Sequence, residues 1–326
     1  MPLSDSDIQS VYHIMLGRDP SPSDYLAWRS LNSVLDLRNA ILTSPEFAAI
    51  FESHSLGVKP PTSSVPTLGY FLPRLPIESV VKPEILTRLL DHVTSTWTKL
   101  GNEKPHWSVL SADAYLPEKI DNSLGAFYAS GEHDAKRVVA ALRRHAHSPE
   151  MFSRVVEYGC GVGRTSVYLA KEFKSLVSID ISKSHLAHAA GLAKGLNIEN
   201  IQFEIATAPT FGMTNSFDLW FSNIVLQHNP PPLIALILSR MMSMLMPGGI
   251  AMFQLPTYCS GYSYDVESYL ANPTSTGTIE VHCLPQSDVF QIASDAGCVP
   301  LEVGEDNGMG PPSRWISNFF IFQKLH

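Results

Sequence analysis

The stretch VVEYGCGVGRTS, residues 155–166, leads from an apolar run through three alternate glycines into a polar segment. An apolar strand, a glycine-rich turn and a helix in this order bind nucleotide-like ligands in many α/β proteins. Several kinds of ligand use such a turn, and they differ in the residues that they need beside the glycines. The neighbouring residues therefore bear on both the fold and the ligand.

The spacing of the glycines and one acid distinguish these ligands. A phosphate-binding loop carries Lys and then Ser or Thr after its last glycine, whereas Arg164 stands there in this chain. The dinucleotide pattern GxGxxG differs from the GxGxG of Gly159, Gly161 and Gly163. Glu157, two residues before the first glycine, repels a pyrophosphate and attracts a ligand with ammonium and sulfonium groups. S-adenosylmethionine carries both groups, so these residues favour it over NAD.

The chain after Arg154 alternates between strand-like and helical patterns. The predicted strands are 154–158, 176–180, 201–205, 217–222, 249–255, 299–304 and 317–324, and the predicted helices between them are 163–173, 183–195, 231–245 and 286–297. This alternation predicts a parallel sheet with helices on both faces and ligands beyond the carboxyl ends of its strands. The last two strands are joined by a loop rich in glycine and proline, which predicts an antiparallel pair.

Asp180 closes the second predicted strand. An acid at this place accepts hydrogen bonds from the two hydroxyls of a ribose. NAD and S-adenosylmethionine both carry that ribose, so Asp180 supports an adenosine-containing ligand without choosing between them.

Four segments, VVEYGCGVGRTSVYLA, LVSIDIS, FDLWFSNIVLQHNP and LMPGGIAMFQLP, resemble the successive signature segments of class I S-adenosylmethionine-dependent methyltransferases. The resemblance covers about residues 153–256. It implies an α/β, Rossmann-like, doubly wound sheet of seven strands, with the last strand inserted antiparallel between the fifth and sixth. It also implies S-adenosylmethionine as the cofactor, with Glu157, Gly159, Cys160 and Gly161 at the methionine end, Asp180 at the ribose and Ile181 beside the adenine.

The chain departs from this family after the third strand. Many members place an acid there that binds the adenine amino group, but Ala206, Thr207 and Ala208 occur in this chain. Thr207 or a backbone carbonyl is the expected replacement, and the alternative is that Thr207 is an ordinary turn residue.

Asn223, Gln227 and His228 follow the fourth predicted strand, where acceptors usually lie in this fold. We expect Asn223 to contact the cofactor and Gln227 to contact the acceptor. His228 is a candidate base for an acceptor hydroxyl, since imidazole accepts protons near neutral pH. The alternative is that His228 only supports the cofactor pocket or the turn.

Residues 257–285 make a longer connection than usual after the fifth strand and contain Tyr258, Tyr262 and Tyr264. We expect this insertion to form a lid whose tyrosines bind the acceptor, with His282 as a second candidate base. The alternative is an additional hairpin whose tyrosines pack on the sheet.

Residues 77–152 predict a helical cap in front of the first strand, with helices that open at Pro83 and cover 134–145. Segments at this place often close over the cofactor in this fold. Tyr128 and Gly131 are therefore predicted cofactor contacts, and Tyr115 is a predicted acceptor contact.

Arg164 is predicted to pair with an acceptor carboxylate, and its alternative is a salt bridge on the first helix of the core. Catechol-type transfer needs acids at the ends of the fourth and fifth strands to hold Mg²⁺. Asn223 is the evident oxygen ligand at the end of the fourth, so we expect metal-independent transfer.

Residues 1–56 predict several short helices. The segments VYHIMLGRDPSPSDYLAW and ILTSPEF resemble a small helical domain of unknown function found in bacterial proteins linked to surface polysaccharide and secretion. We expect a packing or homo-oligomerisation module here. Proline-rich residues 57–76 predict a linker, and residues 77–326 the methyltransferase domain, with its core over 153–326.

Composition limits the partners. The formal net charge is -8 and Lys and Arg form no long run, so we expect no binding to nucleic acid or to a membrane surface. The absence of a long apolar window and of a signal-like start predicts a cytoplasmic protein. The four dispersed cysteines predict reduced thiols.

The leading hypothesis is O-methylation of a small molecule or sugar in bacterial glycan or secondary-metabolite biosynthesis. A small-molecule N-methyltransferase is its nearest rival within the enzymes. A catalytically silent protein that binds S-adenosylmethionine as a sensor or partner subunit is the hypothesis of another class.

Overall fold

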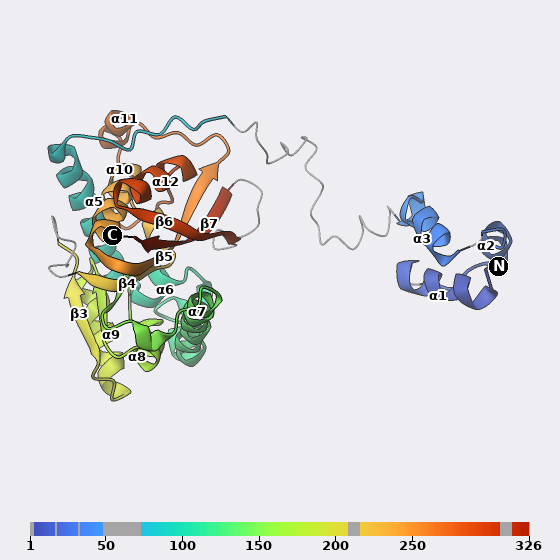
Figure 1. Cartoon of the computed structure of the whole chain (residues 1–326), viewed down its shortest axis with the longest axis horizontal. Coiled ribbons are helices and arrows are strands. Elements are labelled where there is room, and N and C mark those ends of the chain that lie inside the picture. Colours follow the sequence, from blue (N-terminus) through green and yellow to red (C-terminus); the bar gives the residue numbers. More distant parts are fainter. Residues whose placement is uncertain are drawn as a thin grey trace. The chain divides into compact units, whose positions relative to one another are not determined.

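The computed structural model describes residues 3–16, 18–31, 33–47, 73–207, 216–306 and 315–325 (Figure 1). The chain divides into two compact units, Met1–Pro73 and Arg74–His326. None of the helices within the described ranges is both long enough and apolar enough to cross a bilayer.

The N-terminal unit contains α1 (Asp5–Leu16), α2 (Pro22–Trp28) and α3 (Val34–Leu42). Side-chain caps explain where these helices begin: the Ser21 hydroxyl accepts from the Asp24 amide in a capping box, and Ser33 caps α3. The predicted short helices are thus confirmed. A predicted fourth helix starts over residues 45–47, and its remainder lies outside the described residues.

The second unit is built on a sheet of seven described strands in the order β3-β2-β1-β4-β5-β7-β6. The strands are β1 (Val155–Tyr158), β2 (Leu176–Asp180), β3 (Ile201–Ile205), β4 (Phe217–Ser222), β5 (Leu245–Cys259), β6 (Cys298–Asp306) and β7 (Trp315–Lys324). The first five strands pair in parallel, and β7 is antiparallel to both β5 and β6. The predicted doubly wound sheet, with its last strand between the fifth and sixth, is confirmed.

Helices cover both faces of this sheet, because neighbouring residues of each strand point to opposite sides. The helices of the core are α8 (Ser166–Glu172), α9 (Lys183–Gly195), α10 (Pro231–Met244) and α12 (Gln286–Asp295), with the short α11 (Val266–Ala271) in the insertion. Val156 lies in a buried cluster with residues of α10 and α12. Its neighbour Val155 lies in a second cluster with residues of α7 (Leu124–Arg144) and α8. Figure 1 shows these helix pairs on different sides of the sheet.

The cap before β1 consists of α5 (Pro83–Glu103), α6 (Pro105–Val109), the 3-10 turns η1 (Asp113–Tyr115) and η2 (Ile120–Asn122), α7 and the turn η3 (Pro149–Met151). Helix α7 begins ten residues before the predicted start at 134. The helix continues through Gly131, where a Cβ would lie 2.0 Å from the Arg164 carbonyl oxygen. The glycine inside α7 therefore permits a close approach to the glycine turn rather than ending the helix.

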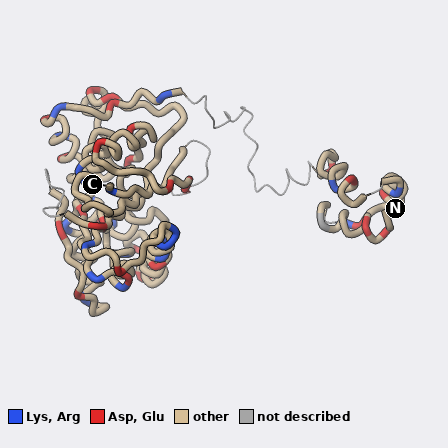
Figure 2. Tube along the Cα trace, in the orientation of Figure 1, with Lys and Arg blue, Asp and Glu red and all other residues tan. Residues whose placement is uncertain are grey.

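The predicted linker overlaps the second unit at its end. Leu75 is buried in a cluster with Cys259 and Cys283, and the Pro76 carbonyl accepts a hydrogen bond from the Tyr264 amide. Residues 57–72 of the predicted linker lie outside the described residues. Lys and Arg are mixed with Asp and Glu along the second unit (Figure 2).

Candidate active site

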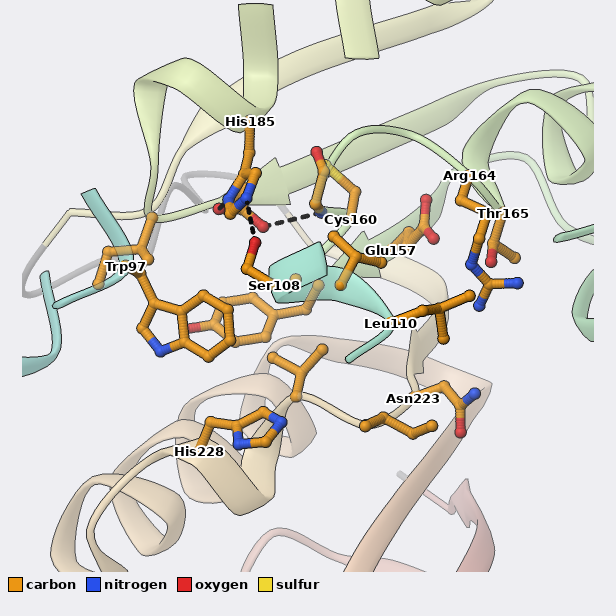
Figure 3. Close-up of a pocket in the computed structure, with 18 of the residues that line it drawn as sticks. Trp97, Ser108, Leu110, Glu157, Cys160, Arg164, Thr165, His185, Asn223 and His228 are labelled. Atoms are coloured by element: carbon orange, nitrogen blue, oxygen red, sulfur yellow. Dashed lines mark hydrogen bonds and ion pairs between the residues drawn. The ribbon is translucent and has the colours of Figure 1, made fainter. Parts of the chain in front are cut away.

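A pocket lies beyond the carboxyl ends of β1, β2 and β4, as expected for a doubly wound sheet (Figure 3). It brings together these predicted site residues: Glu157, Gly159, Cys160, Gly161, Arg164, Asp180, Ile181, Asn223 and His228. The remaining predicted site residues do not line it: Tyr115, Tyr128, Gly131, Gln227, Tyr258, Tyr262, Tyr264 and His282.

The glycine turn needs its glycines for two reasons. Gly159, Gly161 and Gly163 have φ values of +79°, +55° and +78°, a region that side chains strongly disfavour. The space around them is also filled: a Cβ on Gly159 would lie 2.4 Å from Val225, and one on Gly161 would lie 2.7 Å from Val109. Val109 of the cap and Val225 of the loop after β4 therefore both pack against the turn.

Glu157 is a buried carboxylate at the mouth of the turn. Its Oε2 accepts hydrogen bonds from the hydroxyls of Ser166 and Ser178, and the residue lines the pocket. No ion pair in the described part of the chain includes it. Burial raises the pKa of Glu157 to about 7, because the loss of solvation outweighs the hydrogen bonds from Ser166 and Ser178 and the attraction of Arg164. This environment suits a cationic ligand.

Asp180 is held in place by the backbone of the same turn. Its Oδ2 accepts from the Gly161 amide at 2.8 Å and its Oδ1 from the Ser182 amide at 2.9 Å. Each carboxylate oxygen keeps a further lone pair, so Asp180 retains the capacity to accept hydroxyl hydrogens from a ligand.

Sequence reasoning missed Trp97, Ser108 and His185, which also line the pocket. Ser108 Oγ of α6 lies 2.9 Å from His185 Nε2 of α9, and His185 Nδ1 lies 3.6 Å from Asp180 Oδ1. The Trp97 ring of α5 lies 6.4 Å from the His185 ring and 5.3 Å from the His228 ring. These residues come from distant segments, so no local sequence signal marks them.

The pocket has two ends of different chemistry. Asp180, His185 and Trp97 follow one another through the contacts above, and Figure 3 shows Trp97 and His228 near each other and away from Glu157. Arg164, Thr165 and Glu157 lie together in the same view. An elongated ligand with a ribose and a cationic end can therefore meet Asp180 with its ribose and Glu157 with its cationic end.

His228 has a defined tautomer. Its Nδ1 lies 2.7 Å from the backbone carbonyl oxygen of Glu280, which only accepts, so Nδ1 carries the hydrogen and Nε2 is a lone-pair acceptor. Burial lowers the pKa of His228 to about 4, so the ring is neutral at pH 7. Gln227 Nε2 lies 3.4 Å from this acceptor, at the outer limit of a hydrogen bond.

His282 lies in a hydrogen-bonded network inside the insertion. Its Nδ1 lies 2.8 Å from the Tyr262 hydroxyl and its Nε2 lies 3.1 Å from Glu280 Oε2. The Tyr269 hydroxyl donates to the same carboxylate, and the Tyr264 ring packs against His282 at 5.7 Å. Both imidazole nitrogens of His282 therefore have partners, and its role as a base stays a prediction.

The other predicted contacts have structural partners away from the pocket. Tyr115 and Tyr128 pack around Phe127 in a cluster under α7. Gln227 accepts from the Gln254 side-chain amide at 3.0 Å. Tyr258 pairs with Ile316 along β5 and β7. Their functional roles stay predictions.

Arg164 lines the pocket and is also tied to the cap. Its guanidinium pairs with Asp134 and donates to Ser130 Oγ, both on α7. The alternative for Arg164 was a salt bridge on the first helix of the core, whereas the observed salt bridge joins it to α7 of the cap. The contact of Arg164 with an acceptor stays a prediction. Its Nε is buried with no hydrogen-bond partner within the structure described.

Thr207 is exposed and does not line the pocket, while Ala208 lies outside the described residues. No group of three His, Cys, Asp or Glu side chains within the described ranges is arranged to hold a metal ion. Metal independence stays a prediction.

Residues 152–281 match the family model described as a methyltransferase domain. The chain carries a methyltransferase domain. The residues of the pocket fit S-adenosylmethionine, the cofactor expected from the sequence. Glu157 is a buried carboxylate that takes part in no ion pair of the described chain, and it lines the same pocket as Asp180 and the glycine turn.

Two curated relatives match part of the chain, and both are named trans-aconitate 2-methyltransferase. The one from Deinococcus radiodurans is 31% identical over 129 residues, covering 38% of this chain and 46% of the relative. The one from Methylobacterium radiotolerans is 28% identical over 135 residues, covering 40% of this chain and 48% of the relative. The chain spans about half the length of these relatives.

Solved structures are similar over a larger part of the chain. The magnesium protoporphyrin IX methyltransferase from Synechocystis PCC 6803 has 18% identity and a TM-score of 0.49, covering 73% of this chain and 99% of that one. An N-methyltransferase from Bradyrhizobium japonicum WM9 has 19% identity and a TM-score of 0.44, covering 60% of this chain and 88% of that one.

Proposed function

We propose that this protein transfers a methyl group from S-adenosylmethionine to an oxygen atom of a small-molecule or sugar acceptor. The observation that carries this proposal is the buried, unpaired carboxylate of Glu157 beside the glycine turn and Asp180 in one pocket. A cofactor with ribose hydroxyls and two positive charges satisfies both acids.

The cofactor, when bound, supplies a methyl group on a sulfonium sulfur, and the carbon–sulfur bond breaks as the acceptor's lone pair forms the new bond. The chain has to align the acceptor and exclude water. Val109 and Leu110, at the end of α6, line the pocket over the turn. Asn223 lines it from the end of β4.

Oxygen is favoured over nitrogen by the relatives. Trans-aconitate, for which they are named, is a carboxylic acid without nitrogen. A carboxylate acceptor needs no base, whereas a sugar hydroxyl releases a proton during transfer. The engagement of both His282 nitrogens favours an acceptor that needs no strong base.

The test combines binding with turnover. Calorimetry with S-adenosylhomocysteine should show saturable binding. Mass spectrometry should then show methyl esters or methyl ethers within a panel of small carboxylic acids, pyranosides and phenols, with and without a chelator. Absence of binding would overturn the proposal. Methylation of amines alone would instead support the alternative that the protein is a small-molecule N-methyltransferase. Binding without turnover would favour a silent partner or sensor, and loss of turnover with the chelator would overturn metal independence.

We also propose that the N-terminal helices form a contact surface between copies of this chain. Leu26 of α2 and Leu35 of α3 are exposed, at 74% and 55%, in a unit whose small apolar core already excludes them. Exposed apolar side chains of this size are the groups that an association between copies would bury.

A further inference from the structure

Among the described residues directly after β3, none lines the pocket at the place where many class I methyltransferases bind the adenine base. Thr207 is exposed, and neither Ala206 nor Thr207 lines the pocket. An adenine ring offers two flat faces and an amino group whose hydrogens need an acceptor. A buried amino group without an acceptor costs roughly 1–3 kcal/mol.

Trp97 lies near the predicted ribose acid Asp180, on the side of Ile181 and His185. The ribose acid Asp180 is followed by Ile181, which packs in the same apolar cluster as Trp97. His185 connects the same two places, since it lies 3.6 Å from Asp180 Oδ1 and its ring lies 6.4 Å from the indole. The indole is half-buried and lines the pocket, so one region of it faces the cavity. Aromatic faces attract nucleobases by stacking.

His228 supplies the acceptor beside that indole. Its ring lies 5.3 Å from Trp97, tilted by 53°, and lines the same pocket. The Glu280 carbonyl fixes the hydrogen on Nδ1, which makes Nε2 the acceptor of the ring. The Gln227 Nε2 at 3.4 Å is a long contact to this lone pair, which a closer donor from a ligand can replace. In this tautomer Nε2 accepts a hydrogen bond from an amino group, but it carries no hydrogen to donate to a carbonyl oxygen.

We propose that Trp97 stacks on the adenine of the cofactor and that His228 Nε2 accepts a hydrogen bond from the adenine amino group. This assignment rests on the proposed use of S-adenosylmethionine, and it places His228 at the adenosine end of the pocket. Discrimination for adenine then comes from the cap and from the turn after β4, rather than from an acid after β3.

The affinities of two ligands test the stacking on Trp97 and the hydrogen bond to His228 separately. S-adenosylhomocysteine carries the adenine amino group, and S-inosylhomocysteine carries a carbonyl in its place. The substitution His228→Phe keeps a ring but removes the acceptor, so it should weaken S-adenosylhomocysteine about tenfold and leave S-inosylhomocysteine unchanged. The substitution Trp97→Leu should weaken both ligands about tenfold, while Trp97→Phe should retain most of the affinity.

A matched control is Trp107→Leu, because Trp107 is also half-buried on the cap but lies against Lys104 outside the pocket. It should leave both affinities unchanged. Tryptophan fluorescence gives an independent readout: quenching by S-adenosylhomocysteine should be present in the wild type and in Trp107→Leu, and lost in Trp97→Phe.

The outcomes are distinguishable. Unchanged affinity for both ligands in Trp97→Leu overturns the stacking, and an equal loss for both ligands in His228→Phe overturns the hydrogen bond. Unchanged binding with loss of turnover in His228→Phe assigns His228 to proton removal instead. Failure of the wild type to bind S-adenosylhomocysteine overturns the proposed function itself.

Discussion

The substitution Glu157→Gln tests the electrostatic basis of the site. The pKa of this buried carboxyl is about 7 in the folded protein, against an ordinary value of 4.5. Between these values the unfolded chain has released a proton that the folded chain retains, so the free energy of unfolding falls as pH rises. A difference of roughly 2.5 pKa units, at about 1.4 kcal/mol each, corresponds to a cost of about 3 kcal/mol above pH 7.

Glutamine does not titrate and keeps an oxygen for the Ser166 hydroxyl. The variant should therefore gain stability relative to the wild type as pH rises from about 4.5 to about 8, by up to about 3 kcal/mol. It should also bind S-adenosylhomocysteine about tenfold more weakly at pH 8, because the cofactor's ammonium loses a charged partner. The Glu157 carboxylate is thus expected to lower the free energy of unfolding and to strengthen cofactor binding.

Urea unfolding at pH 4.5, 6 and 8, without ligand, measures the first effect, and calorimetry measures the second. Glu204→Gln, on β3 and outside the pocket, is the control for replacing a carboxylate on the same sheet. A stability difference between Glu157→Gln and the wild type that is the same at pH 4.5 and pH 8 would refute the reasoning.

Two further substitutions test the packing and the association surface. Gly163→Ala should destabilise the fold by about 1–3 kcal/mol, because φ is +78° and the new Cβ would lie 2.9 Å from Ala189, whereas Gly191→Ala in α9 meets no atom within 4 Å and should be neutral or stabilising in thermal unfolding. Leu35→Glu should lower the mass of any oligomer seen by light scattering without changing cofactor binding, and an unchanged mass would remove the N-terminal helices from the interface.

Much of the core was predictable because its signals are local. The predicted strands at 176–180, 201–205 and 217–222 coincide with the observed bounds, since buried parallel strands are short apolar runs between polar turns. The glycine turn was also predictable, because positive φ values and close approach restrict its alternate positions to glycine. Glu157 and Asp180 follow from their places at strand ends.

Other features depend on contacts between distant segments. Gly131 is predicted from the sequence as a cofactor contact; the structure places it inside α7, where the Arg164 backbone carbonyl approaches it closely. His282 and the insertion tyrosines carry the residue types of an acceptor site, yet they are bonded to one another through Glu280. No spacing in the sequence distinguishes a tyrosine that faces a pocket from one that packs on a neighbour.

The sequence by itself determined the succession of strands along the chain, the glycine turn and the acids that favour S-adenosylmethionine. Backbone conformation and charge at these positions depend on local residues. Only the tertiary structure decided that Trp97, Ser108 and His185 share one pocket with Asp180. These residues come from α5, α6 and α9, and packing of the cap over the sheet is what brings them together. The same packing set the tautomer of His228, because the carbonyl that fixes it belongs to Glu280 in the insertion.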